Sequence, residues 1–304
     1  MLKILFFKNI NTRLITFNIY FTLARLDKPI GWWLLLLPNW WIICIFENNF
    51  KSLIYYLTIF LFGAITMRSA GCIVNDIWDR NIDKKVKRTS NRPLASEKIK
   101  ISKAIFFLII LCFIGLIILI QLPILTWLVG LCSIPLILFY PLFKRFTHYP
   151  QVILGLTFSC GIPLSASVFF QSLANKSFDG IVYLYIGTFF WVIGYDTIYA
   201  IQDVKDDIKN NIGSLAIKLY KNLKFSLVLI YMLSAIFWFL GFKIYLGYGY
   251  WIYFLLVVIC HLIWQVYKID LKKPHNTEAI FKSNRDVGLI LTIGIISNNY
   301  LFYF

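Results

Sequence analysis

Three aspartates and an asparagine early in the chain have the spacing of a cation site. They occur in the segment Asn75-Asp76-Ile-Trp-Asp79-Arg-Asn-Ile-Asp83, so the carboxylates fall at positions i, i+3 and i+7. Residues at these intervals project from one face of a helix. Because carboxylates at this spacing repel one another, the pattern predicts that a positively charged group lies between them.

A second acidic cluster repeats this arrangement later in the chain. It reads Asp196-Thr-Ile-Tyr199-Ala-Ile-Gln-Asp203-Val-Lys-Asp206-Asp207, and one helical stripe carries all of its numbered residues except Asp206, which lies at the edge. Of the 14 acidic residues in the chain, three fall in the first cluster and four in the second. Acidic residues that only made the protein soluble would be spread more evenly.

Oxygen ligands with few His or Cys partners favour Mg²⁺, which typically binds one or two carboxylates while phosphate oxygens and water complete its octahedron. For one cluster alone, an alternative is a solvated loop in which the aspartates pair with Arg80, Lys84, Lys85 and Lys205. Two such clusters, each at the end of an apolar segment, instead favour a site for metal and diphosphate.

The elements that must position these clusters are membrane helices. The 304-residue chain is 60% hydrophobic and 14% charged, with a mean hydropathy of +0.74, which is too apolar for a water-exposed surface. Its apolar runs approach the roughly 20 residues that a helix needs to cross a bilayer. We therefore expect an all-α bundle of about nine transmembrane helices. The expected spans are 30–46, 52–74, 104–121, 123–140, 151–170, 180–200, 223–241, 249–266 and 287–303.

The net charge of +16 suggests nucleic acid, but the Lys and Arg residues lie in short segments between apolar runs, and membrane topology explains this placement better. Of the loops between the expected spans, the second, fourth, sixth and eighth carry the most Lys and Arg residues. Because cytoplasmic loops hold more of these residues, this predicts a cytoplasmic N-terminus. Residues 1–26 mix basic and apolar residues and are expected to form an interfacial segment, with 27–304 as a single transmembrane domain. With no Arg- and Ser-rich leader, a bacterial inner membrane is favoured over a mitochondrion.

Several motifs in order resemble the UbiA family of intramembrane prenyltransferases, which is marked by NDxxDxxxD and a later Asp-rich motif. The match is closest to the branch that prenylates 4-hydroxybenzoate in ubiquinone synthesis. Its pattern appears in Leu23-Ala-Arg25-Leu-Asp27-Lys28-Pro29-Ile-Gly31, Met67-Arg68-Ser-Ala-Gly71-Cys72, Val86-Lys87-Arg88-Thr89-Ser-Asn91-Arg92-Pro93-Leu94, Tyr140-Pro141-Leu-Phe-Lys144-Arg145-Phe-Thr147-His148-Tyr-Pro150-Gln151 and Tyr195-Asp196-Thr197-Ile-Tyr199-Ala200. The resemblance implies a helical bundle with a central cavity that opens laterally to lipid.

The resemblance also implies a reaction and its site. The substrates would be polyprenyl diphosphate and 4-hydroxybenzoate, joined at the ring carbon ortho to the hydroxyl. The cofactor would be Mg²⁺, which stabilises the departing diphosphate as a Lewis acid. One metal-diphosphate site would comprise Asn75, Asp76, Asp79 and Asp83, and the second would comprise Asp203 and Asp207 with support from Asp196 and Asp206.

Further basic and aromatic residues are candidates for substrate contact. Lys144 and Arg145 are expected to bind diphosphate oxygens or the hydroxybenzoate carboxylate, and topological signalling is the alternative. Arg68 contacts substrate or pairs helices, and Tyr199 orients the acceptor or packs in the bundle.

Gly213 departs from the branch pattern, which usually has Lys before the following Ser. A basic diphosphate contact is therefore missing in this chain, or Lys209 or Lys218 supplies it.

Two other functions remain open on the sequence. One is a relative with another aromatic acceptor, such as a naphthoate, haem or chlorin. The other is a cation-coupled transporter, which would carry carboxylates near the middle of the membrane.

Overall fold

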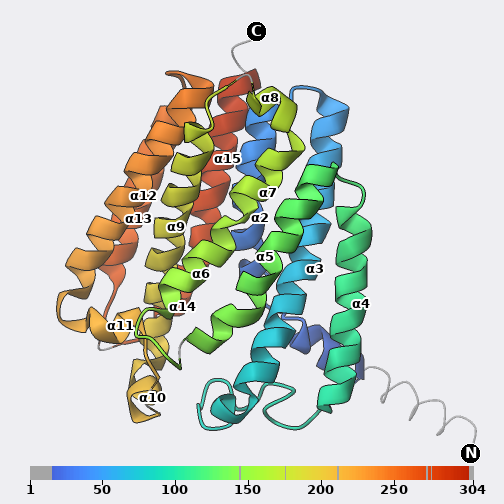
Figure 1. Cartoon of the computed structure of the whole chain (residues 1–304). Coiled ribbons are helices and arrows are strands. Elements are labelled where there is room, and N and C mark those ends of the chain that lie inside the picture. Colours follow the sequence, from blue (N-terminus) through green and yellow to red (C-terminus); the bar gives the residue numbers. More distant parts are fainter. Residues whose placement is uncertain are drawn as a thin grey trace, which may run out of the picture.

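The computed structural model describes residues 16–143, 145–174, 176–210, 212–271, 273–274 and 276–300, and throughout these ranges the regular structure is helical (Figure 1). Short 3-10 turns occur at Ile201–Asp203 and Tyr220–Asn222. The helices are α2 (Ile30–Phe46), α3 (Phe50–Asp83), α4 (Ile101–Leu119), α5 (Ile124–Phe143), α6 (Pro150–Ser159), α7 (Gly161–Val168), α8 (Phe170–Ala174), α9 (Asp179–Ala200), α10 (Val204–Lys209), α11 (Leu215–Lys218), α12 (Leu223–Leu246), α13 (Trp251–Lys268), α14 (Asn276–Lys282) and α15 (Asn284–Tyr300).

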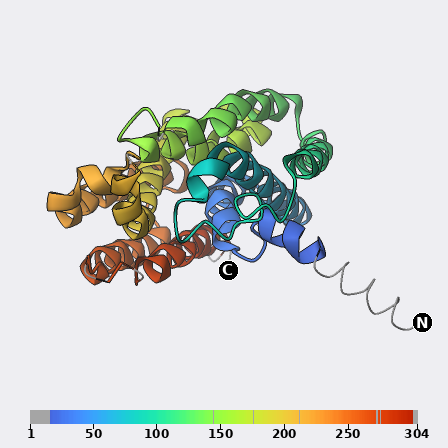
Figure 2. The ribbon, with the colours of Figure 1, turned by 90° about the horizontal axis from the view of Figure 1, so that it is seen from below.

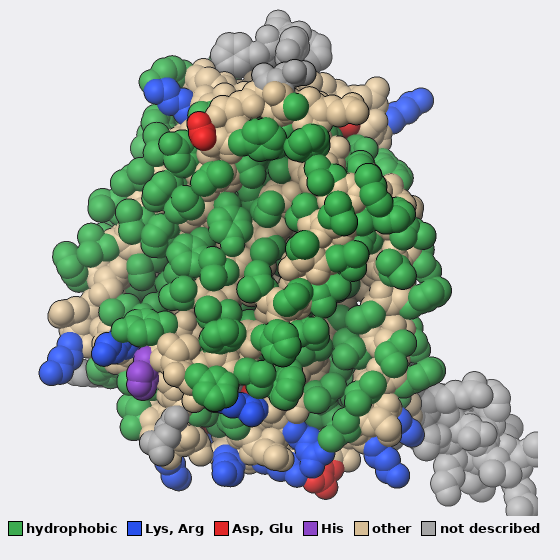
Figure 3. All heavy atoms as spheres, viewed as in Figure 1, with side chains coloured by type: hydrophobic (Ala, Val, Ile, Leu, Met, Phe, Trp, Pro, Cys, Tyr) green, Lys and Arg blue, Asp and Glu red, His purple; other side chains and the backbone are tan. Residues whose placement is uncertain are grey.

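The long helices confirm a multi-pass membrane protein. Within the described part, seven helical stretches are long and apolar enough to cross a membrane, and α2 is apolar but shorter. Each expected span coincides with helical structure, although 151–170 is divided among α6, α7 and α8, and 287–303 runs past the last described residue. Apolar side chains cover the middle of the face in Figure 3, while most Lys and Arg residues lie at its lower end.

Tryptophans fill the core between α2, α9 and α12. The rings of Trp41, Trp191 and Trp238 are fully buried, with centroids 5.3 to 5.8 Å apart. Gly187 allows α9 to approach α12, because a Cβ at this position would lie 3.0 Å from the carbonyl oxygen of Ser234. The packed core therefore holds α9, which carries the second acidic cluster, in a fixed place in the bundle.

Both acidic clusters lie at the lower end of the bundle as drawn in Figure 1. Helix α3 continues past its expected end at residue 74 to Asp83, which makes the first cluster its last turns. Helices α10, α11 and α14 lie at the same end. Seen from this end, α4 and the pair α12 and α13 occupy opposite edges of the bundle (Figure 2).

The chain enters this end through a helix over residues 16–23. Leu23 and Ala24 are buried, and Leu23 packs against Ile73 of α3 and Leu94 of the loop after it. Arg25 follows with a positive φ of 54°. Residues 1–15 lie outside the described part, so the interfacial placement of the whole segment stays a prediction.

Candidate active site

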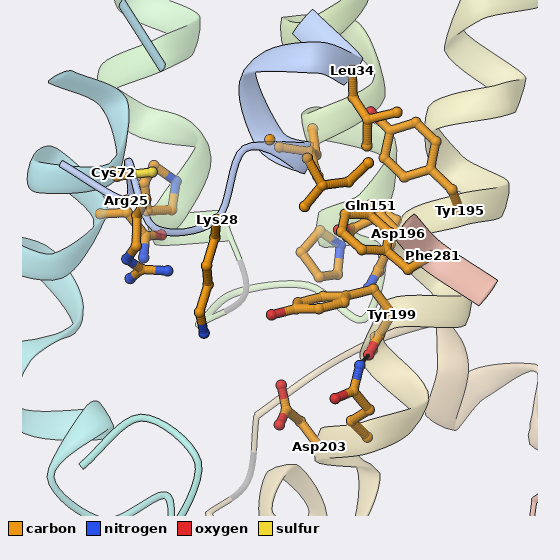
Figure 4. Close-up of a pocket in the computed structure, with 18 of the residues that line it drawn as sticks. Arg25, Lys28, Leu34, Cys72, Gln151, Tyr195, Asp196, Tyr199, Asp203 and Phe281 are labelled. Atoms are coloured by element: carbon orange, nitrogen blue, oxygen red, sulfur yellow. Dashed lines mark hydrogen bonds between the residues drawn. The ribbon is translucent and has the colours of Figure 1, made fainter. Parts of the chain in front are cut away.

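A cavity of about 360 Å³ lies between the two acidic clusters. The first cluster contributes Asn75 to its lining. In Figure 4, Asp196, Tyr199 and Asp203 face Arg25 and Lys28 across the cavity. The remaining predicted residues in the lining are Arg68 and Asp207. The structure thus brings Asn75 of the first cluster and several residues of the second cluster to one cavity, whereas the three aspartates of the first cluster are not among its lining residues.

The aspartates of α3 are buried beside the cavity, and two of them pair with arginines that line it. Asp76 and Asp79 are each 1% exposed, and Asp83 is 5% exposed. Arg25 Nη2 lies 2.6 Å from Asp76 Oδ1, and Arg92 Nη1 lies 3.2 Å from the same oxygen. Arg92 Nη1 also lies 2.7 Å from Asp83 Oδ2. Two guanidinium groups that line the cavity therefore compensate the charge of Asp76 and Asp83.

Arg88 joins the loop after α3 to the second cluster. Its Nε and Nη2 donate to the two carboxylate oxygens of Asp203 at 2.8 and 2.5 Å, and its Nη1 donates to the Tyr199 hydroxyl at 2.8 Å. A bidentate pair of this kind fixes geometry as well as charge. Burial acts to lower the pKa of Arg88, but the hydrogen-bonded carboxylate of Asp203 and the nearby charge of Asp83 outweigh burial and raise the pKa.

The pattern residues Arg25, Lys28, Arg88 and Arg92 line the cavity, yet sequence reasoning did not select them as site residues. Their motifs stood in the sequence, but nothing in a single sequence shows which cations of a basic loop face inward. Burial acts to lower the pKa of Arg25, and the carboxylate of Asp76 more than compensates, so the group stays cationic beside the site.

Other predicted residues lie away from the lining. Arg145 donates to the backbone carbonyl of Trp78, and its Nη2 lies 3.8 Å from Asp79 Oδ1. It therefore contacts the end of α3 rather than the cavity. Asp206 is also absent from the lining residues. Lys144 lies outside the described residues.

Arg68 occupies the inner part of the cavity among aromatic rings. Its guanidinium carbon lies 5.4 Å from the centre of the Phe158 ring, and Tyr140 and Tyr195 also line this region. Its Nε is buried and finds no hydrogen-bond partner among the described residues. A buried cation in a membrane helix is costly, and such residues mark functional sites.

The residues present fit a magnesium ion that arrives with phosphate. Among the described residues, no three Asp, Glu, His or Cys side chains are grouped to hold a metal by themselves. Mg²⁺ rarely needs such a group, because phosphate oxygens and water supply most of its ligands. The second oxygen of Asp76, Oδ2, is buried and accepts no hydrogen bond from the described part of the chain. Carboxylate oxygens beside this cavity are hard ligands of the kind that Mg²⁺ prefers.

Gly213 is tightly packed. A Cβ added there would lie 2.4 Å from the carbonyl oxygen of Thr147 and 2.9 Å from the Cα of His148. A hydrogen bond from the Leu215 backbone N–H to Gln151 Oε1, 3.0 Å long, also holds the loop after α10 in place. The close approach accounts for glycine at this position, and no side chain fits without moving backbone.

The basic groups that line the cavity near Gly213 differ from those expected to replace the usual lysine. The expected substitutes, Lys209 and Lys218, are exposed and do not line the cavity, whereas Lys28 and Lys282 do.

The fold and this site define a multi-pass α-helical membrane protein with a polar cavity at one end, where two acidic helix ends meet a set of arginines. Carboxylates gathered at one end of the bundle differ from the midmembrane placement expected of a transporter. The family model of the UbiA prenyltransferase family matches residues 35–286. The chain belongs to this family.

Known proteins resemble the chain over most of its length. It is 40% identical over 280 residues to 4-hydroxybenzoate geranyltransferase 2 of Lithospermum erythrorhizon, covering 91% of this chain and 89% of that relative. It is 44% identical over 223 residues to 4-hydroxybenzoate octaprenyltransferase of Legionella pneumophila (strain Corby), covering 73% and 77%. A solved UbiA homolog from Archaeoglobus fulgidus bound to GPP and Mg²⁺ has a TM-score of 0.65 at 15% identity, covering 92% and 99%. This last likeness shows the fold alone.

Proposed function

We propose that the chain transfers a polyprenyl group from polyprenyl diphosphate to the ring carbon ortho to the hydroxyl of 4-hydroxybenzoate. The observation that carries the proposal is a cavity lined by Asn75, by residues of the second acidic cluster and by an inner arginine among aromatic rings. The relatives named for 4-hydroxybenzoate support the acceptor. With a polyprenyl donor, we propose that this reaction serves ubiquinone synthesis.

The diphosphate end of the donor would bind where the two clusters face each other. Asp76, Asp79 and Asp83 with Asn75 would hold one Mg²⁺, and Asp203 with Asp207 would hold a second. When bound, Mg²⁺ supplies Lewis-acid stabilisation of the charge that gathers on the departing diphosphate. The arginines that now pair with these carboxylates are placed to donate to phosphate oxygens with their planar forks.

The acceptor would bind deeper, at Arg68. The Nε of its guanidinium has no hydrogen-bond partner among the described residues, and the carboxylate of 4-hydroxybenzoate would supply one of matching bidentate geometry. The flanking rings of Phe158, Tyr140 and Tyr195 suit a flat aromatic acid. Arg68 and Asn75 lie about two helical turns apart on α3, so the acceptor ring would lie between the carboxylate anchor and the diphosphate.

The reaction then requires positioning and charge stabilisation. The carbon-oxygen bond of the allylic diphosphate breaks, a carbon-carbon bond forms at the ring, and the ring proton leaves to solvent or a base. Aromatic side chains around Arg68 exclude water from the allylic cation, which protects it from hydrolysis. A substrate with a long apolar tail also explains why the site lies within a membrane protein.

The proposal is tested in membranes that contain the protein, a polyprenyl diphosphate, 4-hydroxybenzoate and Mg²⁺. We expect a 3-prenylated product that disappears with EDTA and returns with added Mg²⁺. Asp79→Ala or Asp203→Ala should each nearly abolish turnover. Unchanged turnover in both variants would refute the metal assignment, and a preference for a naphthoate in an acceptor panel would refute the acceptor.

The basic end of the bundle would face the cytoplasm of a bacterium, which places the N-terminus and the active site on that side of the inner membrane. The Lys and Arg residues gathered at the lower end in Figure 3 support this orientation. The orientation is tested with a single cysteine introduced into the loop 84–100. We expect an impermeant thiol reagent to label this cysteine only after the cells are opened.

A further inference from the structure

The Arg68 guanidinium packs against an aromatic ring and the backbone of a neighbouring helix. Its Nε makes no hydrogen bond within the described part of the chain. Instead, the group lies by the Phe158 ring of α6 and directly against Gly31, in the first turn of α2. A Cβ built on Gly31 would lie 2.6 Å from Nε, 3.2 Å from Nη2 and 3.3 Å from Cζ. The guanidinium therefore fills the space that a side chain at residue 31 would need.

We propose that Gly31 is a positioning residue that fixes where the acceptor carboxylate binds. The inference rests on the proposed function, in which Arg68 binds that carboxylate. Gly31 acts through Arg68, because the missing side chain is what admits the guanidinium to this part of the cavity. The ring of Phe158 packs beside the guanidinium and restricts its position.

The close approach explains this glycine better than backbone freedom does. Gly31 lies within a regular helix, and its φ is not in the positive range, unlike that of Gly247. Alanine is favoured over glycine in helices, so the backbone alone would accept a methyl group here. The atoms that block the methyl belong to the end of a flexible side chain rather than to backbone, so the methyl would displace the guanidinium and not a helix.

A methyl group at residue 31 would move the guanidinium by a distance that matters for binding. Ordinary contact begins at 3.4 Å, so Nε at 2.6 Å must shift by at least 0.8 Å, the difference between the two values. Charge-assisted hydrogen bonds to a carboxylate hold within a few tenths of an ångström. The acceptor would lose part of the bidentate contact or follow the guanidinium, and in either case its ring would be misplaced relative to the donor.

The experiment compares Gly31→Ala with Gly71→Ala, a matched control on α3. A Cβ at Gly71 would meet only Ile137 Cγ2 at 3.8 Å, which is ordinary contact. Turnover is measured in detergent micelles or membranes against 4-hydroxybenzoate and, separately, against the prenyl diphosphate. We expect Gly31→Ala to raise the KM for 4-hydroxybenzoate at least tenfold, with the KM for the donor and the melting temperature close to those of Gly71→Ala.

The variant Arg68→Gln distinguishes a failure of the proposed acceptor site from a failure of the positioning role of Gly31. If Arg68→Gln leaves the KM for 4-hydroxybenzoate unchanged, the proposed acceptor site itself is wrong. If Arg68→Gln raises this KM but Gly31→Ala does not, the acceptor site stands and the positioning role of Gly31 is overturned. A melting temperature for Gly31→Ala far below that of Gly71→Ala would also overturn it, because the methyl would then strain the fold instead of moving Arg68.

Discussion

Replacing Arg88 with glutamine should change metal affinity and turnover in opposite directions. Arg88 holds both oxygens of Asp203 and the hydroxyl of Tyr199. Any Mg²⁺ that takes Asp203 as a ligand must compete with this guanidinium for the same oxygens. Arg88→Gln removes the competitor, so the metal should bind more tightly when no diphosphate is present.

The size of the effect follows from the burial of the pair. The side chain of Arg88 is 31% exposed and that of Asp203 is 18% exposed, which is intermediate between a surface pair and a core pair. Exposed pairs contribute about 0–1 kcal/mol, and removing one partner of a buried pair costs about 3–5 kcal/mol. A value of about 1–2 kcal/mol for this pair corresponds to an affinity gain of roughly 5- to 30-fold.

The assay is a titration of the purified protein with Mn²⁺, which is visible by electron paramagnetic resonance and replaces Mg²⁺ at oxygen sites. It is repeated with inorganic diphosphate present, where we expect the gain to vanish or reverse, because Arg88 is then proposed to donate to phosphate oxygens. Turnover should fall by about tenfold or more for the same reason.

Lys84→Gln is the matched control for the loss of one positive charge. Lys84 lies in the same loop as Arg88, but its Nζ pairs with Glu97 at the exposed surface, 2.5 Å from Oε1. Its removal should change the Kd for Mn²⁺ by less than about twofold, as expected for a screened surface charge. Equal or weaker Mn²⁺ binding by Arg88→Gln relative to Lys84→Gln, without diphosphate, would refute the competition.

Two further predictions concern the second cluster and the loop after it. Gly213→Lys introduces the lysine of the branch pattern and should lower the free energy of unfolding by about 1–3 kcal/mol, because its Cβ would lie 2.4 Å from the Thr147 carbonyl oxygen. Thermal unfolding in detergent measures this change, and unchanged stability would contradict the prediction. Asp207→Asn should reduce turnover by about tenfold or more, whereas Asp206→Asn, outside the cavity lining, should reduce it by less than about threefold. The measurement is kcat/KM at fixed Mg²⁺, and equal losses in the two variants would indicate that Asp206 also binds the metal.

The helices were predictable from the sequence because a bilayer imposes one simple requirement on every span. A run of apolar residues of sufficient length must be helical there, whatever it packs against. The span 30–46 matches α2 at both ends, and 180–200 matches α9 to within one residue. The division of 151–170 at Cys160 has a local cause, because Pro163 lacks the backbone N–H that would bond to the carbonyl of Ser159 in a continuous helix.

The acidic clusters were predictable for a different reason, since their helical spacing is a local property of the chain. Their partners were not local. Arg25 and Asp76 are 51 residues apart, and Arg88 and Asp203 are 115 residues apart. A basic loop has many cations, and only the folded arrangement decides that Arg88 and Arg92 point inward while Lys84 pairs at the surface. Arg145 shows the converse, because its motif suggested a substrate contact and its side chain reaches Trp78 instead.

The pairing of these carboxylates with arginines has a consequence for the order of binding. A metal ion that arrives alone and takes the oxygens of Asp203 must separate them from Arg88 and leave that cation without a partner in a partly buried place, at a cost of about 1–2 kcal/mol. A diphosphate that arrives alone finds guanidinium groups already satisfied by carboxylates. When both arrive together, the metal would take the carboxylate oxygens and the phosphate would take the guanidinium groups, so every charge would keep a partner. Metal and prenyl diphosphate should therefore bind cooperatively, each raising the affinity of the site for the other by the same factor.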